Sequence, residues 1–163
     1  MKPGDHPEFY RFPAPEGRSR ESTIVLDVHG RWSHEGEAVE HPGLVAAFFS
    51  WVAVHPDDGR WILTNGYDWC YFTPLATAYF VVGVDRANGP TIKLSDGTEE
   101  VLDPSTVRID EDGTLRCLVK QGRAGARFSR LAQLAMEPLL VDGDPVTLAV
   151  AGRSYPIVAS GAA

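Results

Sequence analysis

The sequence predicts an α+β fold: many short antiparallel strands that form a β-roll or partial barrel, two amphipathic helices and a small N-terminal hairpin–helix lobe. Three observations support this prediction. Turn dipeptides recur at short intervals in the second half of the chain. The 16 glycines and 12 prolines favour frequent turns. Two segments carry apolar residues at helical spacing.

The chain of 163 residues fits one compact domain with two small lobes. Residues 1–21 hold prolines among charges and are expected to form an extended N-terminal arm, which Phe9, Tyr10 and Phe12 could fix to the body. A small hairpin–helix lobe is expected over residues 22–66. A β-rich roll with a C-terminal helix is expected over residues 67–163.

The small lobe begins with T-I-V-L-D-V (23–28), whose alternating apolar residues predict a strand. His29-Gly30 marks a tight turn, and R-W-S-H (31–34) returns as the second strand. His41-Pro42 then opens a helix over residues 43–54, because proline suits the first helical turn. Its apolar stripe consists of Leu44, Val45, Phe48, Phe49 and Val52.

After the first helix the pattern becomes a series of short strands separated by Asn-Gly, Asp-Gly and Asp-Pro turns. These strands are expected over residues 60–64, 67–72, 78–86, 91–95, 98–102, 106–110 and 114–120.

A second helix is expected over residues 126–137, before Pro138. Its apolar stripe consists of Phe128, Leu131, Leu134 and Ala135. Two last strands, 145–150 and 154–158, flank the turn Ala151-Gly152.

The order of these motifs resembles an uncharacterised bacterial family, domain of unknown function 1285 (DUF1285). The matching positions are Ile24, Gly30-x-Trp32, Gly36, Leu44-Val45-x-x-Phe48, Asp58-Gly59 and Ala126-Arg127-x-x-Arg130. The overlap runs from about residue 22 to 158. The chain departs from the family at His29, at Asn65 and at Gly125, where the family usually has aspartate, proline and glutamate. The resemblance implies a two-part α+β fold, and it implies no activity.

Composition argues against several functional classes. The formal net charge of −7 disfavours sequence-independent binding to nucleic acid, which depends on cation–phosphate contacts. No apolar run approaches the roughly 20 residues that cross a bilayer, and the N-terminus lacks the apolar core of a signal peptide. We therefore expect a cytoplasmic protein with no nucleic-acid and no membrane partner. Cys70 and Cys117 lie in apolar runs and are expected to be buried free thiols.

The histidines near residues 29–41 raise the question of a metal or catalytic site. His29 lies in a turn, His34 on the following strand and His41 before a helix, so they are not expected to converge as zinc ligands must. We expect no metal and no cofactor. The alternative is a hydrolase-like enzyme with Asp27 and His34 as an acid–base pair, although no G-x-S-x-G motif accompanies them.

Two surfaces are candidates for ligand binding. The first is a group of cations around the start of the second helix, Lys120, Arg123, Arg127 and Arg130. On a helix, Arg127 and Arg130 would be one turn apart and could hold a small anion near the free N–H groups of its N-terminus. The alternative is ion pairing with the acidic turns 99–103 or 110–112.

The second surface is the alternating aromatic set Tyr67, Trp69 and Tyr71, which shares one face of a strand. If this aromatic face is exposed, it would be a platform for a ring-bearing ligand or a protein partner. If it is covered, it would be part of the core. We favour a binding or interaction module over an enzyme. Its partner would be a small anion or a protein, with a homodimer or a structural subunit of an oligomer as further alternatives.

Overall fold

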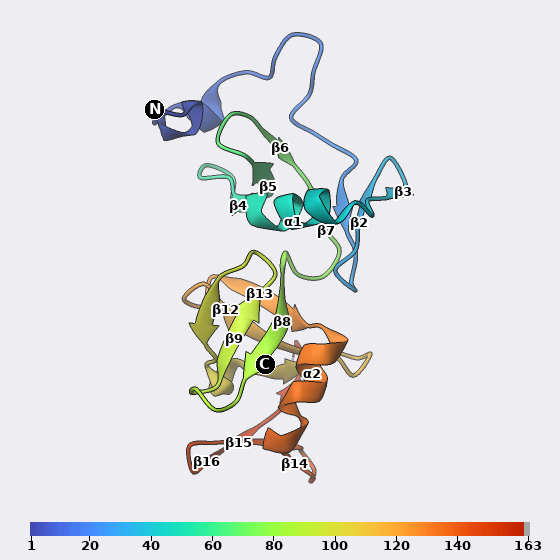
Figure 1. Cartoon of the computed structure of the whole chain (residues 1–163), viewed down its shortest axis with the longest axis vertical. Coiled ribbons are helices and arrows are strands. Elements are labelled where there is room, and N and C mark those ends of the chain that lie inside the picture. Colours follow the sequence, from blue (N-terminus) through green and yellow to red (C-terminus); the bar gives the residue numbers. More distant parts are fainter. Residues whose placement is uncertain (162–163) are drawn as a thin grey trace. The chain divides into compact units, whose positions relative to one another are not determined.

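The computed structural model describes residues 1–161, and its contacts divide the chain into two compact units (Figure 1). Unit 1 is Met1–Ala78 and unit 2 begins at Tyr79. The strand Trp69–Tyr71, assigned above to the roll, pairs with Trp61–Thr64 within unit 1. The predicted α+β class, with antiparallel-rich sheets and two helices, is confirmed. None of the helices over residues 1–161 is long and apolar enough to span a bilayer.

Unit 1 carries one helix and two small sheets, in the strand orders β3-β2-β1-β7 and β4-β5-β6. Its elements are the 3₁₀ turns η1 (Pro3–Asp5) and η2 (Phe9–Arg11), strands β1 (Val25–Leu26), β2 (Trp32–His34) and β3 (Glu37–Ala38), helix α1 (Pro42–Trp51), and strands β4 (Val52–Val54), β5 (Trp61–Thr64), β6 (Trp69–Tyr71) and β7 (Thr73–Pro74).

Helix α1 ends at Trp51, so the helix predicted over residues 43–54 was wrong at its C-terminal end. Residues 52–54 form β4, which pairs with β5. The reason is that Val52 and Val54 are β-branched and fit a pleated strand with a partner available. The start of α1 agrees with the prediction, because His41 is its N-cap and Pro42 its first residue.

The arm is not fully extended, since it forms η1 and η2 and packs on the second small sheet. Phe9 is buried with Ile62 and Trp69. A further aromatic cluster surrounds Trp32, which is 2% exposed and contacts the rings of Phe48, Phe49 and Phe72. Apolar burial of this kind is the main stabilising contribution available to so small a unit.

Unit 2 is built on an open seven-stranded sheet in the order β10-β9-β8-β13-β12-β11-β17, with a separate sheet β14-β15-β16. Its elements are β8 (Tyr79–Asp85), β9 (Thr91–Leu94), β10 (Glu99–Val101), η3 (Pro104–Thr106), β11 (Arg108–Ile109), β12 (Leu115–Val119), β13 (Ala124–Phe128), α2 (Arg130–Met136), η4 (Glu137–Leu139), β14 (Leu140–Val141), β15 (Thr147–Val150), β16 (Arg153–Pro156) and β17 (Val158–Ala159).

The second helix begins at Arg130, so the prediction of a helix from residue 126 was wrong. Residues 124–128 form β13, a central strand that pairs in parallel with β8 and antiparallel with β12. Ser129 is the N-cap of α2, with its hydroxyl accepting from the N–H of Ala132. The predicted apolar stripe is also displaced: Ala132 and Met136 are buried, whereas Leu131 and Leu134 are exposed.

Candidate functional site

Arg127, one of the four cations considered for anion binding, lies on β13 with only 6% of its side chain exposed. Its Nη1 donates to Asp110 Oδ2 at 2.5 Å, and its Nη2 donates to Asp112 Oδ2 at 2.7 Å. Arg116 also pairs with Asp110. Arg127 therefore already binds two carboxylates of its own chain, which is the ion-pairing alternative with the 110–112 turn.

The other three cations do not gather around Arg127. Lys120 Nζ lies 2.7 Å from Asp96 Oδ2, and Arg123 is exposed in the turn between β12 and β13. Arg130 is exposed at the first position of α2. Because Arg127 is on a strand, it and Arg130 are not one helical turn apart, and the geometry assumed for a shared anion does not exist.

The carboxylates around Arg127 make unit 2 sensitive to acid. Arg127 donates to Asp112 and holds its pKa well below the ordinary 3.8. Burial alone would raise the pKa of Asp110, but hydrogen bonds from Arg116, Ser160 and Arg127 outweigh it, so this pKa is also lowered. A carboxyl with a lowered folded-state pKa contributes stability that is present above its unfolded pKa and is lost as the pH falls through the folded pKa.

We therefore expect the urea midpoint of unit 2 to fall as the pH drops below about 3.8. The variant Arg127→Met should show a flatter dependence, because it has lost the partner of both carboxyls. Urea unfolding followed by far-UV circular dichroism between roughly pH 2 and 6 measures this, and tryptophan fluorescence, which reports unit 1 alone, identifies the part of the transition that belongs to unit 1. If the urea midpoint depended on pH equally in the wild type and in Arg127→Met, the pairing of Arg127 with these two carboxyls would not be the source of the acid sensitivity.

The histidines predicted not to converge lie at separate places on unit 1. His29, His34 and His41 are all exposed, and His41 Nδ1 accepts the N–H of Leu44 as a helix cap. Over residues 1–161 there is no group of three or more His, Cys, Asp or Glu that could hold a metal. Asp27 Oδ1 accepts from the N–H groups of the turn, while His34 lies at the other end of the β1–β2 ladder. The acid–base pair of the enzyme alternative is thus not assembled.

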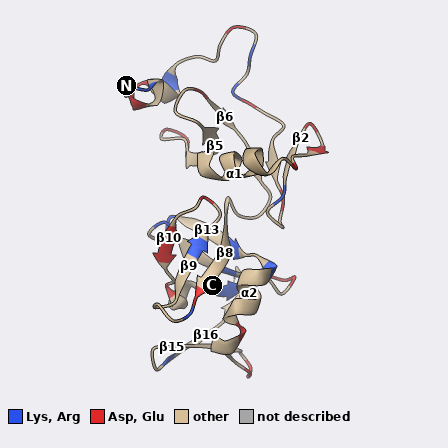
Figure 2. Ribbon diagram, in the orientation of Figure 1, with Lys and Arg blue, Asp and Glu red and all other residues tan. Residues whose placement is uncertain are grey.

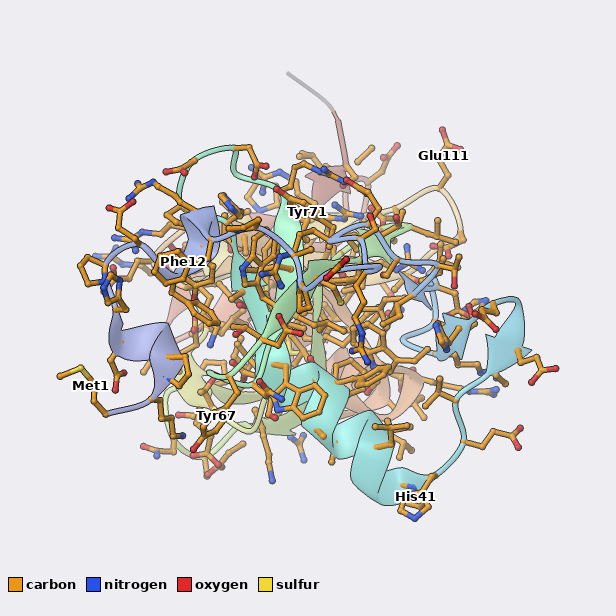
Figure 3. All side chains as sticks on the ribbon, turned by 90° about the horizontal axis from the view of Figure 1, so that it is seen from above. Met1, Phe12, His41, Tyr67, Tyr71 and Glu111 are labelled. Atoms are coloured by element: carbon orange, nitrogen blue, oxygen red, sulfur yellow. The ribbon has the colours of Figure 1, made fainter. Side chains whose placement is uncertain are left out.

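The aromatic set Tyr67, Trp69 and Tyr71 divides between surface and core. Trp69 is 6% exposed, whereas Tyr67 precedes the strand and is 62% exposed. Tyr71 is half-buried beneath the guanidinium of Arg60, 3.6 Å from its ring centroid, and its hydroxyl donates to Asp58 at 2.6 Å. Tyr67 and Tyr71 are well separated in Figure 3. They do not form a common platform.

Unit 1 does contain a groove of about 280 Å³ beside Trp69. The arm, α1, β5 and β6 contribute to it, and α1, β5 and β6 carry no charged residue (Figure 2). Its apolar wall consists of Ile24, Phe48, Trp51, Leu63, Trp69 and Cys70. Burial raises the pKa of the Cys70 thiol, so this wall is uncharged at neutral pH. We call it the aromatic groove.

The arm forms the polar side of the aromatic groove because side chains hold it in place. The guanidinium of Arg20 pairs with Asp68, donates to the Trp69 carbonyl at 2.8 Å and lies over the Trp69 ring at 4.5 Å. His55 is buried against the arm, and its Nε2 lies 3.2 Å from the Tyr10 carbonyl. Arg11 forms an ion pair with Asp57 at 2.7 Å. The groove therefore depends on contacts distributed along the whole arm.

Arg18 is the cation at the aromatic groove that remains available to a ligand. It is exposed, and over residues 1–161 its guanidinium makes no hydrogen bond or ion pair. Arg20, in contrast, is already bound to Asp68. An apolar groove with a few polar groups at its rim is the usual form of a small-ligand site, although about 280 Å³ is at the small end of the range.

Sequence reasoning missed this groove. The sequence analysis placed Arg18 in the charged arm and Trp51 in the first helix, and it assigned neither residue to a binding site. The available signal was the presence of all four tryptophans between residues 32 and 69, since tryptophan is large and is rarely buried completely.

Comparison with solved structures identifies the fold. A DUF1285 family protein from Silicibacter pomeroyi DSS-3 superposes with a TM-score of 0.63 at 15% identity, over 91% of each chain. A DUF1285 family protein from Shewanella baltica OS155 gives a TM-score of 0.54 at 16% identity, over 74% of this chain and 94% of that one. Neither a scan of protein-family models nor a search of curated proteins gave a match. The chain thus has the fold of DUF1285 proteins, as the motif resemblance predicted.

Proposed function

We propose that this chain is a non-enzymatic binding module whose ligand is a small molecule with a ring-shaped apolar body and one anionic group. The ring body lies against Trp51 and Phe48 in the aromatic groove, and the anionic group pairs with Arg18. The observation that carries the proposal is the apolar groove of about 280 Å³ with, at its rim, a guanidinium that forms no hydrogen bond or ion pair among the described residues and only a weaker electrostatic interaction with Asp68.

Arginine suits this role, since its planar donors match a carboxylate, sulfonate or phosphate. Arg127 and Arg130 are left out of the proposal because Arg127 is occupied by Asp110 and Asp112. The cytoplasmic setting, the homodimer and the absence of a cofactor all stay predictions.

Anilinonaphthalene sulfonate is a suitable probe, because it combines fused rings with one anionic group. We expect one saturable site, and Arg18→Ala should weaken binding roughly 10- to 100-fold, the value of a charge-assisted hydrogen bond of about 1.5–3 kcal/mol. Trp51→Ala should weaken binding as well. Isothermal titration calorimetry measures both.

Two controls make the experiment specific. Phenylnaphthylamine has the same rings without the sulfonate, so Arg18→Ala should leave its affinity unchanged while Trp51→Ala lowers it. Arg123→Ala removes another exposed arginine, from unit 2, and should leave both probes unaffected. The proposal fails if the sulfonate binds wild type and Arg18→Ala equally, or binds neither.

A further inference from the structure

A second groove lies in unit 2 along β10, the edge strand of the seven-stranded sheet. Strand β10 pairs with β9 on one side, in the register Glu99↔Lys93, Glu100↔Ile92 and Val101↔Thr91. On its other side the groove, of about 850 Å³, separates it from β12 and the turn at residues 120–123. We call this the edge groove.

The backbone of β10 has hydrogen-bonding groups that no other strand uses. The N–H of Leu94 donates to the carbonyl of Thr98, and the N–H of Leu102 donates to that of Pro90. In an antiparallel pair the direction alternates, so the N–H and C=O groups of Glu99 and Val101 point away from β9. Within the described part of the chain these outward groups have no hydrogen-bond partner.

Two N–H groups of the opposite wall of the edge groove are already used. The N–H of Leu118 donates to the Thr106 hydroxyl at 3.1 Å, and the N–H of Lys120 donates to the Glu100 carboxylate at 3.2 Å. Two apolar side chains are nevertheless presented to the groove: Val101 is 67% exposed and Leu118 is 46% exposed. The space therefore suits one added strand with apolar side chains, bound to β10 by its backbone.

The charges around the edge groove favour a basic occupant. Glu99, Glu100 and Asp103 line it, and β10 is acidic in Figure 2. Two cations also line it, and one of them, Lys120, is already paired with Asp96. The remaining cation, Arg123, does not balance the three carboxylates, so the groove has a net negative charge.

We propose that the edge groove binds an extended segment of a partner protein, which adds a strand to β10 and alternates apolar with basic side chains. Backbone hydrogen bonds to Glu99 and Val101 supply the pairing. Glu99 and Val101 share one face of β10 and Glu100 lies on the other, so the alternation directs valine-like side chains to the face of Val101 and lysine-like side chains to the face of Glu100. Strand addition to an exposed sheet edge is an established mode of peptide recognition. The proposal is independent of the aromatic groove.

The test uses a fluorescein-labelled peptide, Lys-Val-Lys-Val-Lys-Val-Lys, and fluorescence polarisation. We expect saturable binding that Glu-Val-Glu-Val-Glu-Val-Glu does not show. Two further peptides carry N-methyl groups on either the valine or the lysine amides, which blocks one edge of the added strand at a time. One of the two should lose at least tenfold in affinity and the other should not. Equal binding of both would mean electrostatic attraction without strand pairing and would overturn the proposal, as would failure of the parent peptide.

The protein offers a matched variant. Val101→Pro removes an outward N–H, and proline is tolerated on the free side of an edge strand, so pairing with β9 should survive. We expect this variant to lose peptide binding while Val101→Thr retains it, with circular dichroism unchanged for both. Arg18→Ala should bind the peptide as wild type does. If Val101→Pro disturbs the fold, the N-methylated peptides still decide the outcome.

Discussion

Replacing Arg127 by alanine is expected to lower the free energy of unfolding of unit 2 by about 3–5 kcal/mol. The guanidinium is nearly inaccessible, and its removal leaves Asp110, which is also largely buried, with one partner fewer. Removing one member of a buried ion pair is costly because the remaining charge, here Asp110 with Arg116 alone, has lost part of the compensation for its removal from water. The result would identify Arg127 as a structural residue.

The measurement needs a probe confined to unit 2. Cys117 is buried on β12, whereas Cys70, the second cysteine of the chain, belongs to unit 1. In a Cys70→Ser background, the rate at which a thiol reagent labels Cys117 reports the opening of unit 2. Arg123→Ala is the control, expected to change stability by no more than about 0.5 kcal/mol. A labelling rate for Arg127→Ala equal to that of this control would contradict the structural role.

Replacing Trp32 by alanine is expected to destabilise unit 1 by about 3–5 kcal/mol. The side chain is 2% exposed and packs its ring against those of Phe48, Phe49 and Phe72, with centroids 5.2–5.3 Å away. Its Nε1 makes no hydrogen bond within residues 1–161, so Trp32→Phe removes packing alone and should cost much less.

Tryptophan fluorescence during urea unfolding measures this effect selectively, because all four tryptophans of the chain precede Ala78. Leu44→Ala, at a position of α1 that is 41% exposed, provides the matched control on the helix. If Trp32→Ala and Leu44→Ala lowered the urea midpoint by the same amount, the aromatic cluster would not be the core of the unit.

Local patterns predicted most strands, because alternation and turn dipeptides act over a few residues. The Asp-Gly turns at Gly97 and Gly113, for example, have the positive φ that glycine accommodates without strain. The start of α1 was predicted from a similarly short signal, the adjacent residues His41 and Pro42.

The errors arose where distant pairing outweighed local propensity. Residues 124–128 suit a helix as well as a strand, and they become β13 because β8, far away in the sequence, pairs with them. Ion pairing of the cations with the 110–112 turn was foreseen as an alternative, but the burial of Arg127 on a central strand was not, because its partners lie in the turn of another hairpin.

The candidate site was hidden for a related reason. The aromatic groove joins an arm, a helix and a hairpin, and its cation comes from a segment whose composition predicts only an extended chain. The part of the arm that carries Arg18 is held by the Arg20–Asp68 ion pair, which joins residues far apart in the sequence. Such pairs cannot be assigned from one sequence.

The most direct measurement of the proposed function uses the indole N–H groups of Trp32, Trp51, Trp61 and Trp69, each of which gives one signal in a proton–nitrogen correlation spectrum. Tryptophan-to-phenylalanine variants assign the four signals. On titration with anilinonaphthalene sulfonate, binding in the aromatic groove predicts that Trp51 and Trp69 shift together and saturate, while Trp32 and Trp61 stay in place. No shift, or equal shifts of all four signals, would contradict it.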